Sequence, residues 1–215
     1  MSFLNQLKSQ AKALQGEQDA QQHDLALNTA QTEAAAVRAW LYLQDLAKQL
    51  NVIAPDGPSL SLDGKTPWPA MRLSGFRADS RMKRLRQQDV HDHLGMWWRI
   101  LPVSGQAVAG EISVNFPPDL QRVESRLAAG QVRHERKEIR HAEKNSLLAI
   151  RFEYMTESRG TLTLTPDHDK AQIAFRIANA RGFEVVSVTK PAADVTPALL
   201  DEMAKLVIGQ PNRFC

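Results

Sequence analysis

Cysteine is almost absent from the sequence, and no stretch of it is long and apolar enough to cross a membrane. The single cysteine, Cys215, excludes an intrachain disulfide and a cluster of thiolate metal ligands. A membrane-spanning helix needs about 20 apolar residues in a row, and the apolar runs here are far shorter. Residues 1–10 have neither the basic nor the apolar region of a secretory signal. We therefore expect a cytoplasmic protein that does not insert into a membrane.

Glycine and proline follow no period, with 11 of each in 215 residues, which excludes a collagen-like chain. The formal net charge is only +3 and 43% of the residues are hydrophobic, so intrinsic disorder is disfavoured. A chain of this length buries roughly 70% of its unfolded surface. The composition is that of a globular protein with a sizeable core.

The signatures of common enzyme classes are missing as well. The sequence contains no glycine-rich phosphate loop, no Gly-x-Ser-x-Gly, no His-Glu-x-x-His and no Cys-x-x-Cys. These absences favour a non-enzymatic protein, and no motif calls for a cofactor.

Residues 1–53 have the composition of a helical arm, rich in alanine, glutamine and leucine and free of proline. We expect helices over about 2–15 and 19–51, either separate or continuous through Gly16. The longer helix carries a heptad-like apolar seam, and a similar seam lies nearer the start of the chain. The first consists of Ala36, Trp40, Leu43, Ala47 and Leu50, and the second of Leu4, Leu7, Ala11 and Leu14.

Three roles are open to these seams: docking on the chain's own sheet, an intermolecular coiled coil, and an amphipathic helix on a membrane surface. The polar face is mostly glutamine rather than lysine or arginine, which disfavours the membrane surface. Docking on the sheet is the simplest role, because packing supplies most helix stability. A helix over 19–51 is nevertheless roughly 50 Å long, more than a domain of this size covers. A projecting section that meets a protein partner or a second copy fits this length better.

A Pro/Gly-rich linker at 54–69 separates the arm from an α+β domain at 70–215. Alternating apolar residues predict strands on both sides of a middle helix, and the short joins after residue 147 require antiparallel hairpins. Residues 131–146 are very polar and suit either a solvated helix or a mobile connector. The predicted fold class is α+β, with a long N-terminal helical arm, a mainly antiparallel sheet of about seven strands in one or two parts, and a C-terminal amphipathic helix.

Two histidines form the most metal-like pattern in the sequence. His91 and His93 are two residues apart, so on a regular strand both imidazoles would lie on one face. A metal site needs further ligands, and the only other candidate group, around His168, falls in an expected turn. A polar turn that leads into the strand is the simpler interpretation.

Residues 72–88 carry six arginines and lysines against one aspartate, more than the net charge of the whole chain. Basic side chains neutralise phosphates and aromatic side chains stack on bases, so this segment and the tryptophan after it predict a surface for single-stranded nucleic acid. The candidate residues are Arg81, Lys83, Arg84, Arg86 and Trp97.

The sequence thus favours a non-enzymatic cytoplasmic binding or assembly module that acts through protein–protein contacts of its helical arm, including self-association. The alternative is a nucleic-acid-binding protein that uses the basic segment 72–88. A metal-dependent enzyme at His91 and His93 is the third hypothesis.

Overall fold

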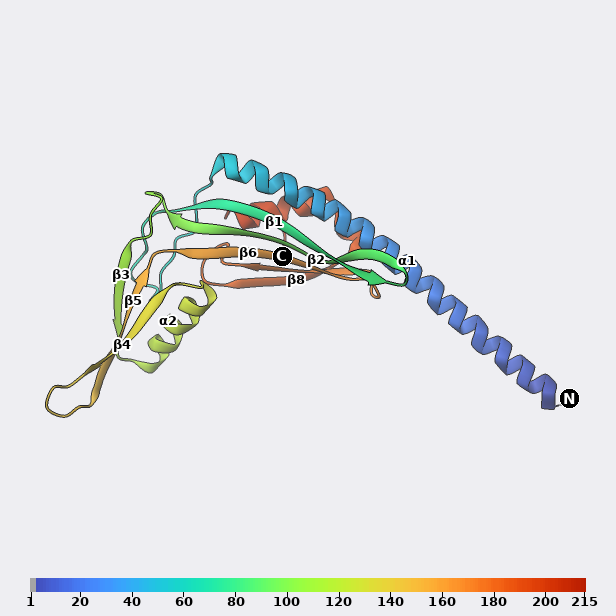
Figure 1. Cartoon of the computed structure of the whole chain (residues 1–215), viewed down its shortest axis with the longest axis horizontal. Helices are drawn as coiled ribbons and strands as arrows, with labels where there is room; N and C mark the ends of the chain where they lie inside the picture. Colours follow the sequence, from blue (N-terminus) through green and yellow to red (C-terminus); the bar gives the residue numbers. More distant parts are fainter. Residues whose placement is uncertain (1–2) are drawn as a thin grey trace.

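The computed structural model describes residues 3–215, and it confirms the α+β class (Figure 1). A long N-terminal helix precedes two antiparallel sheets, and a helix lies near the C-terminus. The helices are α1 (Phe3–Ile53), α2 (Pro117–Ala129) and α3 (Pro197–Val207), with a 3-10 helix at Ala192–Asp194. The strands are β1 (Met71–Leu85), β2 (Gln88–Pro102), β3 (Ala109–Val114), β4 (His134–Arg140), β5 (Leu147–Met155), β6 (Ser158–Asp167), β7 (Gln172–Ala178) and β8 (Val185–Pro191).

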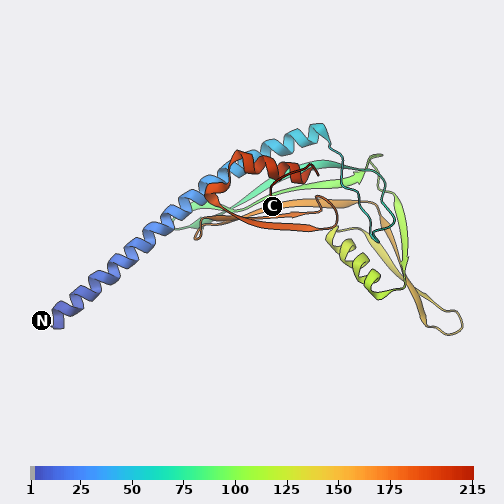
Figure 2. The same ribbon diagram turned by 180° about the vertical axis from the view of Figure 1, so that it is seen from behind.

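The larger sheet has five strands in the order β1-β2-β6-β7-β8, and the smaller has three in the order β3-β5-β4. The larger sheet is curved, and α1 runs over one of its faces (Figure 1). Seen from behind, α3 lies beside α1 on the same face (Figure 2). The smaller sheet and α2 lie at the end of the molecule opposite the N-terminus, so the other face of the larger sheet carries no helix along most of its length.

The alternation along β2 explains how the sheet forms its core. Leu94, Met96, Trp98 and Ile100 are at most 1% exposed, whereas Trp97 between them is 40% exposed. Successive side chains of a strand point to opposite faces, so one face of β2 is apolar and packs under the helices. The buried face of α1 joins the same core.

One segment differs from the sequence predictions, and one alternative that they left open is decided. The polar segment 131–146 contains a strand, β4, because its backbone pairs with β5 at the edge of the smaller sheet. Charged side chains are typical of edge strands, since they discourage pairing with other chains. The helix is also continuous through Gly16, which costs about 1 kcal/mol relative to alanine but leaves every backbone hydrogen bond of the helix possible.

The Pro/Gly-rich segment 54–69 is packed rather than loose. Leu60, Leu62 and Trp68 are buried in the main core. Burial acts to raise the pKa of Asp63, but hydrogen bonds from the backbone of Thr66 and Lys65 and from nearby hydroxyls outweigh it and hold this pKa at about 2. The segment therefore fixes the end of α1 against the sheets.

Candidate functional site

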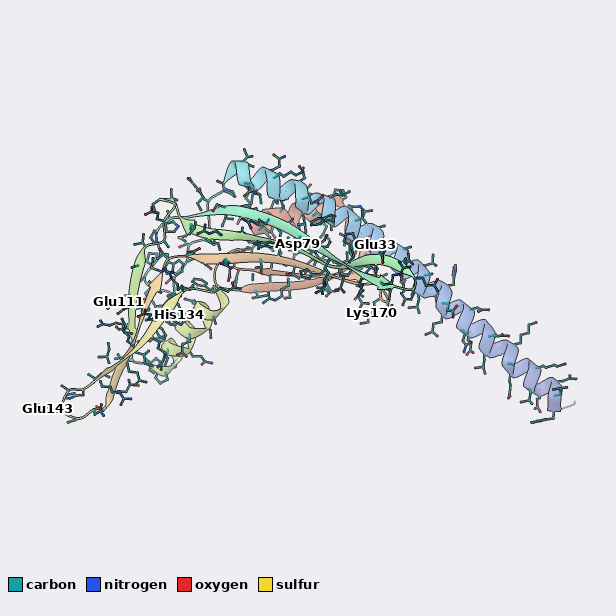
Figure 3. The ribbon with its side chains drawn as sticks, in the orientation of Figure 1. Glu33, Asp79, Glu111, His134, Glu143 and Lys170 are labelled. Atoms are coloured by element: carbon teal, nitrogen blue, oxygen red, sulfur yellow. The ribbon has the colours of Figure 1, made fainter. Side chains whose placement is uncertain are left out.

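Residues 3–24 of α1, which we call the free arm, extend past the end of the larger sheet, beyond the ends of its strands (Figure 1). Every residue of the free arm is exposed, and apart from Gln22 at its base, which lies near the β1–β2 turn, its side chains project into solvent (Figure 3). Leu4, Leu7 and Leu14 are 57%, 45% and 59% exposed. A helix that meets only water is normally polar all round, so this row of leucines marks a surface that can bind.

The leucines of the free arm face the same direction as the residues by which α1 packs on the sheet. An α-helix has about 3.6 residues per turn, so residues 36 apart lie one above the other after about ten turns. Leu7 is related in this way to Leu43, and Leu14 to Leu50; both later leucines are buried. One apolar face thus runs along the whole helix. The sheet covers its second half, and no described residue covers its first.

The seam at Ala36, Trp40, Leu43, Ala47 and Leu50 lies against the chain's own sheet. All of these residues are buried except Trp40, which is half-buried. The expectation of a partner helix on this seam is therefore corrected, because the apolar face of the larger sheet already occupies it. The seam that remains exposed for contact with another chain is that of the free arm, at Leu4, Leu7, Ala11 and Leu14.

A group of polar contacts fixes α1 where it leaves the sheet. Glu33 accepts a hydrogen bond from the backbone N–H of His91 at 2.8 Å and another from its ring Nδ1 at 2.6 Å. The carbonyl of His91 accepts a hydrogen bond from Nε2 of the buried His168 at 2.8 Å. Figure 3 places Glu33 at the end of the sheet from which the free arm departs.

The tips of two hairpins complete this junction. Arg86, in the β1–β2 turn, donates to the hydroxyl of Thr29 at 2.7 Å and forms an ion pair with Asp169 in the β6–β7 turn. Asn28 donates to the carbonyl of Asp169 at 2.7 Å. The junction therefore ties residues 28–33 to both hairpins and sets the direction of the free arm.

Glu33→Ala should destabilise the protein by about 1–3 kcal/mol, because the backbone N–H and the ring of His91 lose their acceptor in a buried position. Urea unfolding followed by circular dichroism measures the loss. The control is Glu143→Ala, an exposed glutamate in the β4–β5 hairpin, which should change stability by less than about 0.5 kcal/mol. Equal unfolding free energies of the two variants would show that the contact between Glu33 and His91 does not stabilise the fold.

A bulge in β2 separates the two histidines of the metal hypothesis. Arg81 pairs with His93 and Met82 with His91, which leaves Asp92 as the extra residue. His91 turns to α1, whereas the ring of His93 lies 3.3 Å from the position that a Cβ of Gly95 would occupy, on the face away from the helices. The two imidazoles therefore do not converge. Among residues 3–215 there is no group of three or more histidine, cysteine or acidic side chains placed to hold a metal ion.

The four cations of the nucleic-acid hypothesis each contact an acidic side chain of the same chain. Arg81 and Lys83 lie 2.5 and 3.1 Å from Asp92, and Arg84 lies 3.2 Å from Asp89. Hydrogen bonds from Lys83 and Arg81 lower the pKa of Asp92. The fourth cation, Arg86, forms its ion pair with Asp169 in the junction with α1. A phosphate would have to displace these contacts to bind here.

Trp97 lies apart from those four cations. It pairs across the strands with Arg77, on the face of the larger sheet that α1 does not cover. Arg77 has no ion-pair partner within residues 3–215. This pair is the part of the candidate nucleic-acid surface that remains free for a ligand.

Comparisons with models of protein families, with curated proteins and with solved structures gave no match. Within the described residues, no helix has a segment apolar and long enough to span a membrane.

The junction residues Thr29, Glu33 and Asp169 were not predicted as functional. They are far apart in the sequence and no spacing connects them, so only the fold brings them together.

Proposed function

We propose that this protein is a non-enzymatic binding or assembly module and that its free arm binds another protein. The observation that carries this proposal is the seam at Leu4, Leu7, Ala11 and Leu14, which continues the packed face of α1 into solvent. The junction at residues 28–33 fixes the base of the arm at the end of the sheet, so the arm is presented to a partner in one direction.

The spacing of the seam suits a helix that lies in an apolar groove. Such helices bind through anchors three or four residues apart, and the four seam residues have this spacing. Most of the stability of helices in proteins comes from packing of an apolar face, so a partner that covers this face also stabilises the free arm. Charge favours one orientation: Lys8 and Lys12 lie near the start of the free arm, and Glu17, Asp19 and Asp24 near its base. The partner's groove should be basic where it meets the base.

The test is affinity capture from the source cell with the full chain as bait. Leu7→Glu/Leu14→Glu should lose a protein that the wild-type chain retains, with at least about a tenfold drop in recovery, because two charges enter the apolar contact. Asn5→Glu/Ser9→Glu adds the same charge on the opposite side of the helix and should retain it. Equal recovery with all three baits, or no captured protein, would refute the proposal.

Nuclease treatment of the lysate separates this function from the nucleic-acid alternative. A partner bound by the arm should remain after treatment. A partner that disappears with the nucleic acid, and that is also lost from a Trp97→Ala/Arg77→Ala bait, would support the alternative. Binding through phosphates should then weaken steeply with salt.

A further inference from the structure

A second apolar seam runs along α1 on the side away from the sheet. Its positions alternate by three and four residues over four heptads, the spacing of a two-stranded coiled coil. All of them are exposed, and the three largest aliphatic members, Leu27, Val37 and Leu41, are 48%, 40% and 60% exposed. We call this the outer seam; it consists of Ala13, Gly16, Ala20, His23, Leu27, Ala30, Ala34, Val37 and Leu41.

The outer seam points directly away from the body of the protein. Leu41 lies two residues from each of the buried Ala39 and Leu43, which is a rotation of about 200° from both. The outer seam is therefore distinct from the free-arm seam, which faces the sheet side. Along the helix the two seams meet near residue 14, where Leu14 ends the free-arm seam and Ala13 and Gly16 begin the outer seam.

We propose that the outer seam binds α1 of a second copy of this chain, with the two helices antiparallel. In the register that pairs Leu27 with the partner's Ala30, large residues lie opposite small ones. Val37 meets the partner's Ala20, and Leu41 meets the partner's Gly16. A parallel pair would instead place Leu41 on Leu41 and Gly16 on Gly16, which crowds one layer and leaves a void in the other.

The antiparallel register also brings opposite charges together. In an antiparallel coiled coil, residues at one flanking heptad position face residues at the same heptad position of the partner. Glu17 and Arg38 share such a position, and this register brings Glu17 beside the partner's Arg38. Arg38 donates one hydrogen bond to the carbonyl of Val195 at 2.7 Å through Nη1. Neither Glu17 nor Arg38 forms an ion pair within residues 3–215, and symmetry makes the contact between them twice.

A parallel pair would place Asp19 beside the partner's Asp24, which repels. It would also place Lys12 beside the partner's Glu17, which attracts. The orientation is therefore selected by the sizes of the seam residues rather than by charge.

The length of α1 fits the same partner. This register pairs residue 3 with about residue 54, so the two helices overlap from end to end. The free arm of each copy then lies along the sheet-bound half of the other. A second copy thus explains why α1 extends so far beyond its own sheet. It also leaves the seam of the free arm exposed for the proposed protein partner.

Light scattering of the full chain after size exclusion tests this inference. The wild-type chain should have twice its monomer mass of 24.0 kDa. Leu27→Glu/Leu41→Glu should raise the dimer dissociation constant at least about 100-fold, since it places charges in the apolar contact, and should keep the circular dichroism of the fold because both residues are exposed. Leu7→Glu/Leu14→Glu should remain dimeric even though it loses the proposed protein partner. A monomeric wild-type chain, or a dimer unaffected by the outer-seam variant, would overturn the inference.

Disulfide trapping tests the orientation. With Cys215→Ser as background, chains carrying Ala20→Cys and Val37→Cys are mixed and oxidised. The mixture should cross-link and each chain alone should not, because an antiparallel pair brings the two positions together. In a parallel pair they would be about 25 Å apart, far beyond disulfide reach. Cross-linking of Val37→Cys alone would contradict the antiparallel arrangement.

Discussion

Gly160→Ala should destabilise the protein by about 3 kcal/mol, the upper end of the usual cost of overpacking a core. Gly160 of β6 pairs directly with Trp98 of β2, and a Cβ added at Gly160 would lie 2.0 Å from the indole ring. The ring cannot move aside easily, because Trp98 is 1% exposed and stacks on Phe76 with centroids 5.7 Å apart. Either the indole leaves its packed position or the two strands separate.

Urea unfolding of Gly160→Ala and Gly182→Ala measures this effect. A Cβ at Gly182 would meet nothing within 4 Å, so this control should change stability by less than about 0.5 kcal/mol. The double variant Trp98→Leu/Gly160→Ala should recover part of the loss, because the smaller side chain removes the clash. If Gly160→Ala were as stable as Gly182→Ala, the packing of the larger sheet described above would be wrong.

Leu43→Ala should destabilise the protein by about 2–5 kcal/mol, because it leaves a cavity where α1 meets the sheet. Leu43 is fully buried at the centre of the seam that packs on the chain's own strands. The same variant should leave the exposed seam of the free arm unchanged, since residues 3–24 lie beyond the sheet. Loss of fold and loss of partner binding can thus be separated.

Val52→Ala is the matched control on the same helix. Val52 is 85% exposed near the end of α1, so its replacement should change stability by less than about 0.5 kcal/mol in chemical unfolding. A small loss for Leu43→Ala, comparable with that of the control, would mean that α1 does not dock as the structure has it.

Much of the fold could be predicted from the sequence because its patterns follow the geometry of single elements. The alternation at Leu94, Met96 and Trp98 predicts one covered face, and Thr196 caps α3 by accepting a hydrogen bond from the backbone of Leu199. Strand β4 could not be predicted, because its only apolar member is Ile139 and its place comes from pairing with β5. Backbone pairing between distant segments leaves no periodicity in the edge strand.

The candidate site was predictable only in part, for a related reason. Leu7 and Leu43 have the same apolar spacing around them, and the sequence does not distinguish the seam that a sheet covers from the seam that it leaves free. The bulge at Asp92 directs His91 to Glu33 and separates it from His93, although a regular strand would have kept both histidines on one face. Contacts such as Arg86 with Asp169 depend on the arrangement of two hairpins and leave no local signal.

The central claim is that residues 3–24 are free of their own chain and are covered by another. Amide hydrogen exchange on the full chain tests it directly, since exchange reports local opening segment by segment. In dilute protein, residues 3–24 should exchange fast while 33–50 stay protected, and in the complex recovered by affinity capture both segments should be protected. Strong protection of residues 3–24 in the dilute chain, or fast exchange there in the complex, would contradict the account.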